Sequence, residues 1–151
     1  MKKISDLSSV FYMWVSFALG IIAVFMMFVP IAVYDGGFII SAKTMFFGDG
    51  YNGGAWLSFV GYMLILAASI GVAVLALPVV SPSSKVEKIV LISAIGLVLI
   101  GMVLVALIQA FYKMNNGAYQ NFEYFHSGFY LTIFFSLAAI TMDVVALVLD
   151  W

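Results

Sequence analysis

Four long apolar stretches dominate the pattern of hydrophobic and polar positions along this chain. They cover residues 10–33, 55–80, 89–112 and 127–149. Each is long enough to cross a hydrocarbon core of about 30 Å as an α-helix, which takes roughly 20 residues. We therefore predict an all-α membrane protein in which residues 1–151 form a single domain that spans the bilayer four times. The first stretch is too long and too aromatic for a signal peptide, so we expect it to be retained.

The segments between these stretches determine how the helices connect. Residues 81–88 form a short connection with Pro82, which stops a helix from continuing, so the second and third spans must be antiparallel neighbours. An up-down four-helix bundle follows, with two longer connections at residues 34–54 and 113–126.

The lysines predict the orientation of the bundle. Four of them, Lys2, Lys3, Lys85 and Lys88, belong to the N-terminus and the short connection, whereas the two long connections carry Lys43 and Lys113 alone. Positive residues accumulate on the cytoplasmic side of membrane proteins. We therefore expect cytoplasmic N- and C-termini, two external loops at 34–54 and 113–126, and a location in the plasma membrane, of bacterial type.

Composition supports the membrane assignment and excludes several classes of function. Hydrophobic residues make up 66% of the chain and charged residues 9%, whereas soluble domains are about one quarter charged. The excess apolar surface must therefore contact the lipid bilayer. The formal net charge of -1 provides no basic surface for nucleic acid, and the absence of cysteine excludes disulfides, thiolate metal sites and thiol nucleophiles.

Small residues spaced four apart predict where helices approach one another closely. Ser16 and Gly20 form one such pair in the first span, and Ala67 and Gly71 form another in the second. Gly96 and Gly101 are five apart and lie on different parts of the helix surface, so they are not a dimerisation motif. We interpret the two pairs as packing positions within the bundle.

The connection at 34–54 is long and unusually apolar. Its central run, FIISAKTMFF, lies between the turn-forming segments DGG and GDGYNGG, so we predict a β-hairpin or small sheet on the outer surface. Its apolar side must be covered, either as a lid over the helix ends and the second loop or by a partner chain. The predicted interaction surface comprises Phe38, Ile40, Phe46, Phe47, Tyr51 and Trp56.

The layout of the chain resembles that of small bacterial tetraspan membrane proteins, and in outline that of claudin-type tetraspans. The resemblance is carried by Gly128, Phe129, Tyr130 and Leu131 at the start of the last span, and by Gly48, Asp49, Gly50 and Trp56 at the end of the first loop. It implies a left-handed four-helix bundle with a small extracellular sheet and a role in lateral assembly, adhesion or subunit support. The Trp-Gly-Leu-Trp motif and the loop cysteines of claudins are absent, so no paracellular pore is implied.

Few polar groups are available for chemistry. Glu123 and His126 are three apart and could share a helix face, but zinc requires three or four ligands, and only Asp35 or Asp49 could add another on the outside. The GDGYNGG segment has a single carboxylate where a calcium loop supplies several. We therefore predict no enzymatic activity, no metal site and no cofactor.

Asp143 is the only acidic residue well inside a span, and such residues are functional candidates by default. Without a functional role, its carboxyl group could be protonated, could reach towards the membrane interface, or could pair structurally with Lys85 or Lys88 across the short connection. In a functional role, it would couple protons or ions in an oligomeric channel or small transporter. We predict a non-enzymatic membrane subunit or assembly protein that forms a homo-oligomer or binds other membrane proteins, with transport through Asp143 as the alternative.

Overall fold

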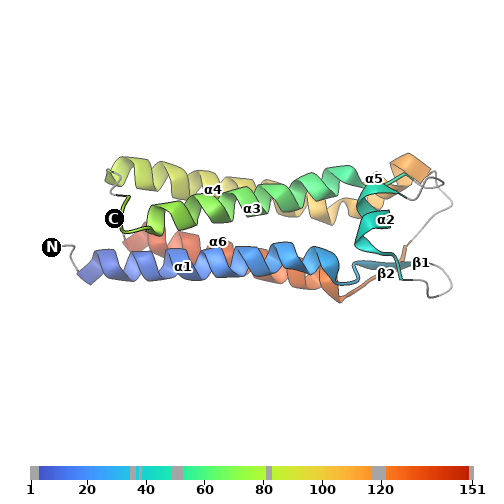
Figure 1. Cartoon of the computed structure of the whole chain (residues 1–151), viewed down its shortest axis with the longest axis horizontal. Helices are drawn as coiled ribbons and strands as arrows, with labels where there is room; N and C mark the ends of the chain where they lie inside the picture. The colour runs from blue at the N-terminus through green and yellow to red at the C-terminus, as the bar shows by residue number, and fades with distance from the viewer. Residues whose placement is uncertain are drawn as a thin grey trace.

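Four long helices lie side by side in the computed structural model of the chain (Figure 1). The structure describes residues 4–34, 37, 39–48, 53–80, 83–116 and 122–149. The helices are α1 (Ile4–Phe25), α3 (Trp56–Ala76), α4 (Ser84–Ala106) and α6 (Ser127–Leu149). Among the described residues, four helical segments are long and apolar enough to cross a membrane, as expected for a multi-pass membrane protein.

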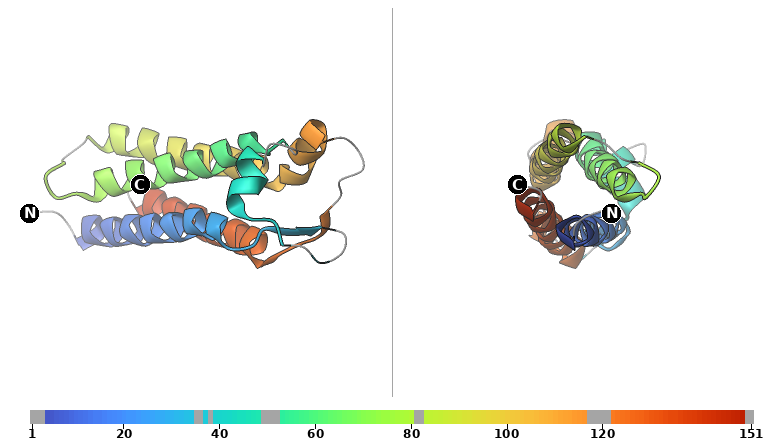
Figure 2. Two further views of the ribbon diagram at one scale, coloured as in Figure 1. Left: turned by 45° about the vertical axis from the view of Figure 1, so that its right-hand side comes forward. Right: turned by 90° about the vertical axis from the view of Figure 1, so that its left-hand side faces the viewer.

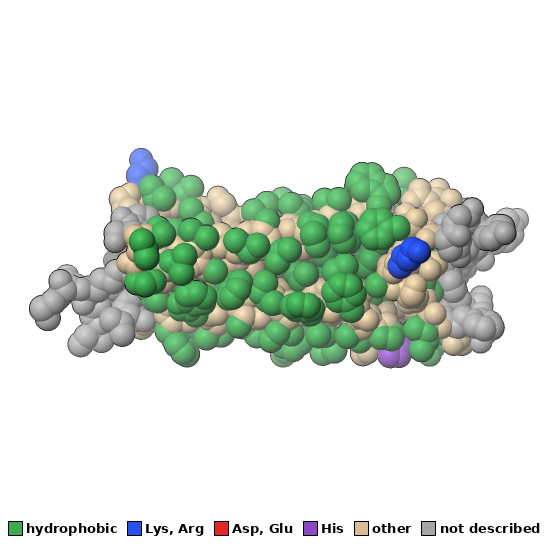
Figure 3. Space-filling model, in the orientation of Figure 1, with side chains coloured by type: hydrophobic (Ala, Val, Ile, Leu, Met, Phe, Trp, Pro, Cys, Tyr) green, Lys and Arg blue, Asp and Glu red, His purple; other side chains and the backbone are tan. Residues whose placement is uncertain are grey.

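The long helices surround a common core. Seen along the bundle in the right-hand view of Figure 2, they follow one another in the order α1, α3, α4 and α6 around a ring. The pairs α1–α6 and α3–α4 share the most extensive contacts, and α4 and α6 pack least closely of the four neighbouring pairs. Hydrophobic side chains cover the flank drawn in Figure 3, and lysines are seen there only towards the two ends.

The shorter elements gather at one end of the bundle, which we call the loop end (Figure 1). They are the 3-10 helix η1 (Met26–Phe28), strand β1 (Ala32–Tyr34), and helices α2 (Ala42–Phe47) and α5 (Ile108–Asn116), together with strand β2 (Phe122–Phe125). The beginning of α1 and the end of α6 lie at the opposite end, which we call the terminal end.

The first span ends earlier than its apolar composition suggests. Helix α1 stops at Phe25, η1 adds one tight turn, and Val29 is extended with φ −82° and ψ 145°. Val29 precedes Pro30, and a residue before proline is sterically pushed away from the helical region. The proline therefore marks the end of the helix, and the chain turns into β1.

The structure contains a small two-stranded sheet, but its two strands do not both belong to residues 34–54. Strand β1 pairs antiparallel with β2, with Val33 opposite Tyr124, so the small sheet joins the segment after α1 to the segment before α6. Residues 42–47 of the FIISAKTMFF run form α2 instead of a strand. The Ser41 side chain accepts a hydrogen bond from the Thr44 N–H at the start of α2, and Gly48, with φ 79°, ends it.

Candidate functional site

The buried face of α6 is built entirely from small and polar residues. Its members follow one another three or four positions apart, which places them on one stripe of the helix: Gly128, Thr132, Ser136, Ala139, Asp143 and Ala146. Helix α1 packs against this helix and buries two serines of its own, Ser9 and Ser16. We call the contact between α1 and α6 the polar seam.

Hydrogen bonds across the polar seam fix its register. The Ser16 hydroxyl donates to the Ala139 carbonyl oxygen at 3.2 Å, and the Thr132 hydroxyl lies 3.5 Å from the Ala23 carbonyl oxygen. The second contact lies seven residues further along α1 and seven residues back along α6, so the two helices are antiparallel in constant register. Thr132 also lies 3.1 Å from the Tyr62 hydroxyl, which extends the polar seam to α3.

Asp143 lies inside the polar seam and is only 1% exposed. Its carboxyl group forms a hydrogen bond with the Ser16 side chain. The structure therefore gives Asp143 a serine partner from α1, whereas the predicted partner Lys85 is exposed in the first turn of α4 and Lys88 lies half-buried one turn further on. Two buried oxygens, Oδ1 of Asp143 and Oγ of Ser136, have no hydrogen-bond partner among the described residues.

The two predicted small-residue pairs have different surroundings. Ser16 and Gly20 both face the core, and a Cβ atom on Gly20 would clash with the Ser69 side chain of α3. Ala67 is exposed, and no described heavy atom lies within 4 Å of the position that a Cβ on Gly71 would occupy. Ala67 and Gly71 therefore make no close helix contact within the described chain, because they lie on the outer side of α3.

A glycine pair that spacing alone did not indicate brings α3 and α4 together. A Cβ atom on Gly61 would lie 2.6 Å from the Gly101 carbonyl oxygen, and a Cβ on Gly101 would lie 2.6 Å from that of Gly61. The two backbones thus touch directly, as small residues allow in membrane helices. We call the contact between α3 and α4 the glycine seam. The sequence gives no spacing signal for this contact, because the two glycines belong to different helices.

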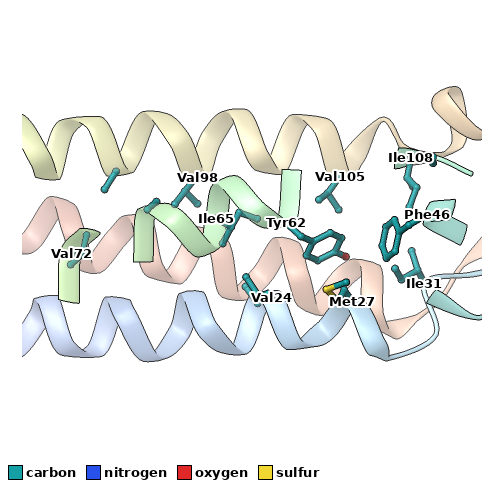
Figure 4. Close-up of a cluster of buried hydrophobic side chains, with 14 of the residues drawn as sticks. Val24, Met27, Ile31, Phe46, Tyr62, Ile65, Val72, Val98, Val105 and Ile108 are labelled. Atoms are coloured by element: carbon teal, nitrogen blue, oxygen red, sulfur yellow. The ribbon is translucent and has the colours of Figure 1, made fainter. Parts of the chain in front are cut away.

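Helix α2 covers the loop end of the core. Ile40, Met45 and Phe46 are buried, and the Phe46 ring lies 5.6 Å from the Tyr62 ring with an edge-on geometry. Figure 4 shows Phe46 reaching the cluster near Ile31 and Ile108. Of the predicted interaction surface, Ile40 and Phe46 therefore serve the protein's own core, whereas Phe47 and Trp56 are 61% and 56% exposed. Phe38 and Tyr51 lie outside the described residues.

Two asparagines of α5 fasten the first loop to the bundle. The Asn116 side chain accepts a hydrogen bond from the Gly53 N–H at 2.6 Å and donates one to the Gly53 carbonyl oxygen at 2.7 Å. The Asn115 amide donates to the Gly54 carbonyl oxygen at 2.6 Å. These contacts hold the segment before α3 in place. Sequence reasoning did not identify the two asparagines, because an asparagine at a helix end equally suits a simple turn.

Among the residues that the structure describes, the remaining polar candidates do not assemble into a reactive site. His126 lies after β2, where its Nδ1 is 2.9 Å from the Ser127 hydroxyl oxygen. The Glu123 side chain, Asp35 and Asp49 lie outside the described side chains. Within the described part of the chain, no three histidine, cysteine or acidic residues are grouped closely enough to hold a metal ion.

An open apolar groove of about 610 Å³ follows the loosely packed contact between α4 and α6. It lies within the two candidate spans, towards the loop end. The lining comes from the last turns of α4 and the first turns of α6, and consists of Met102, Val103, Ala106, Phe129, Tyr130, Ile133, Phe134 and Leu137. We call this surface the α4–α6 groove.

Comparison with known proteins does not place the chain in a family, since no family model, curated protein or solved structure matches it.

Proposed function

We propose that this protein is a non-enzymatic integral membrane subunit or assembly protein that acts by lateral helix packing. The observation that carries the proposal is the α4–α6 groove, an apolar hollow of about 610 Å³ on the surface that faces the bilayer. Its occupant is a transmembrane helix of a second chain, either another copy or a different membrane protein. This helix packs into the α4–α6 groove, which the helices of the bundle itself do not fill.

The energetics of helix association in lipid support this assignment. Lipid tails are as apolar as the side chains, so membrane helices associate through shape complementarity instead of hydrophobic burial. A concave apolar surface gains more packing contacts from a convex helix than a smooth helix face does. The aromatic rings of Phe129, Tyr130 and Phe134 provide broad contact areas along the α4–α6 groove.

A tryptophan in the α4–α6 groove tests the proposal. Val103 lines this groove and is 57% exposed, so the side chain of Val103→Trp occupies the groove without entering the core. We expect the variant to fold but to lose its oligomer or co-purifying partner, as measured by mass in mild detergent. Val74→Trp is the matched control, because Val74 is 45% exposed on α3, which does not line the groove. A Val103→Trp protein with an unchanged assembly mass would refute the proposal.

The loop end supplies a second, smaller contact surface in this proposal. Phe47 and Trp56 are large, exposed and close to the ends of α2 and α3. The buried positions of Ile40 and Phe46 support the lid role for the described part of the first loop around α2. The contact surface at the loop end therefore consists of Phe47, the last residue of α2, and Trp56, the first residue of α3.

We further propose that the loop end is extracellular and that both termini are cytoplasmic in a bacterial plasma membrane. Lys85 and Lys88 begin α4 near the terminal end, whereas Lys43 and Lys113 belong to α2 and α5 at the loop end. Ser83 and Ser41 are both exposed and suit labelling after substitution by cysteine. We expect an impermeant reagent added outside intact cells to label Ser41→Cys and not Ser83→Cys; the reverse pattern would invert the topology.

Ion-coupled transport is the second candidate function. It is favoured by Asp143, whose buried Oδ1 has no hydrogen-bond partner among the described residues. Buried carboxyl groups of this kind line proton and ion paths in membrane proteins. A proton flux in reconstituted vesicles that disappears in Asp143→Asn would favour transport over assembly, and the absence of any flux would remove this candidate.

A further inference from the structure

We propose that Asp143 is a proton-binding site: in the folded bundle its carboxyl group is neutral and donates its proton to the Ser16 hydroxyl oxygen. The proposal is independent of the lateral assembly described above. It rests on the hydrogen bonds of the polar seam and on the burial of the carboxyl group.

The Ser16 hydroxyl group lies between two groups that can accept its proton. The Ser16 side chain has one O–H proton, and its hydroxyl donates to the Ala139 carbonyl oxygen at 3.2 Å. The same hydroxyl is hydrogen-bonded to the Asp143 carboxyl group. A carboxylate and a carbonyl are both acceptors, so a charged Asp143 would compete with Ala139 for a single proton.

A neutral Asp143 removes this conflict. Its O–H group donates to the Ser16 hydroxyl oxygen, and the Ser16 O–H group donates to the Ala139 carbonyl oxygen. The resulting chain leads from α6 to α1 and back to α6, with every proton directed at an acceptor. Because successive hydrogen bonds polarise one another, the two bonds strengthen each other in this arrangement.

The unpartnered oxygen supports the same protonation state. Asp143 Oδ1 is buried and accepts no hydrogen bond from the described chain. In a neutral carboxyl group this atom is an uncharged carbonyl oxygen, whose burial without a partner has a moderate cost. In a carboxylate it would share a full negative charge, and burying an unpaired charge costs far more.

Within the described part of the chain, Ser16 is the one side chain recorded as interacting with the Asp143 carboxyl group. The constant register places it level with the residues between Ser9 and Ser16 of α1, where Tyr12 is half-buried. On α3 the titratable residue is Tyr62, which contacts Thr132. On α4, Lys85, Glu87 and Lys88 belong to the first two turns, which lie at the same end of the bundle as the last two turns of α6 with Asp143. At the loop end, Tyr124 and His126 precede α6.

Infrared spectroscopy of the purified full chain in lipid nanodiscs at neutral pH tests the proposal. A protonated carboxyl group has a C=O stretching band separate from those of carboxylates and amides. We expect this band in the wild-type protein and its loss in Asp143→Asn, whose amide group can still donate to Ser16. Glu87→Gln is the matched control, because it removes a carboxyl group from the start of α4, and it should retain the band.

A second variant leaves Asp143 unchanged. Ser16→Ala removes the acceptor of the proposed proton, so the band should persist and shift to the higher frequency of a carboxyl group without that hydrogen bond. A folded wild-type protein without the band, or a band that survives in Asp143→Asn, would overturn the proposal. An unshifted band in Ser16→Ala would overturn the assignment of Ser16 as the proton acceptor.

Discussion

The polar seam and the glycine seam join helices of similar length in the same bundle by different means. At the polar seam, α1 and α6 meet through Ser16, Thr132 and Asp143, with side-chain hydrogen bonds to backbone carbonyl groups. At the glycine seam, the backbones of α3 and α4 touch at Gly61 and Gly101, and one hydrogen bond, from the Ser58 hydroxyl to the Leu104 carbonyl oxygen at 2.8 Å, crosses nearby.

The difference shows two ways of holding helices together where water is excluded. A glycine contact depends on volume, because an added methyl group has no space between two backbones. A polar contact depends on hydrogen-bond partners, because an unmatched buried donor or acceptor is costly. The glycine seam should therefore respond most strongly to added atoms, and the polar seam to removed ones.

The largest expected effect concerns the cap that α2 places on the α3 side of the core. Phe46 is 1% exposed and contacts the rings of Phe59 and Tyr62, so Phe46→Ser should lower the free energy of unfolding in detergent by about 3–5 kcal/mol. Phe47→Ser is the control, because Phe47 is 61% exposed and contacts only the Phe59 ring, at 5.0 Å, among the described aromatic rings, so its loss should stay within the roughly 0.5–1.5 kcal/mol of one aromatic pair. Equal losses for the two neighbours would show that α2 is not a cap.

Substitutions of two glycines in α4 should differ in their effect on stability, and the larger of the two effects should be of intermediate size. Gly101→Val places a Cβ atom 2.6 Å from the Gly61 carbonyl oxygen and should force the glycine seam apart, at a cost of about 1–3 kcal/mol. Gly96→Val should be close to neutral, since no described atom lies within 4 Å of its Cβ position. Thermal unfolding in detergent measures both, and a Gly96→Val protein that is less stable than Gly101→Val would contradict the glycine seam.

The smallest effects should distinguish the hydrogen bonds of the two seams. Ser16→Ala removes contacts to both Ala139 and Asp143, whereas Ser58→Ala removes one contact to Leu104. Polar contacts between membrane helices average about 0.6 kcal/mol and reach about 1.7 kcal/mol. We expect the loss in free energy of unfolding to be near the upper value for Ser16→Ala and near the average for Ser58→Ala. Equilibrium unfolding in detergent measures both losses. A larger loss of stability for Ser58→Ala than for Ser16→Ala would contradict the view that hydrogen bonds matter more at the polar seam than at the glycine seam.

Much of the fold could be predicted from the sequence because the bilayer imposes simple requirements on length and polarity. Four apolar stretches had to be helices, since an isolated segment in lipid satisfies its backbone hydrogen bonds only in that form. The loop end was less predictable. The FIISAKTMFF run suits a strand by composition, yet the Ser41 cap and Gly48 end a helix over residues 42–47. Strand β1 then pairs with a segment some 90 residues away, and local preference carries little information about such a partner.

The sequence by itself determined the number of long apolar helices and identified Asp143 as the unusual acid, because both follow from local composition. Only the tertiary structure decided that Asp143 meets Ser16, that Gly61 meets Gly101, and that Phe46 is buried while Phe47 is exposed. The physical reason is that an apolar helix in lipid has no polar outer face to reveal which side points inward. Its orientation emerges only when small and polar side chains find matching positions on a neighbouring helix.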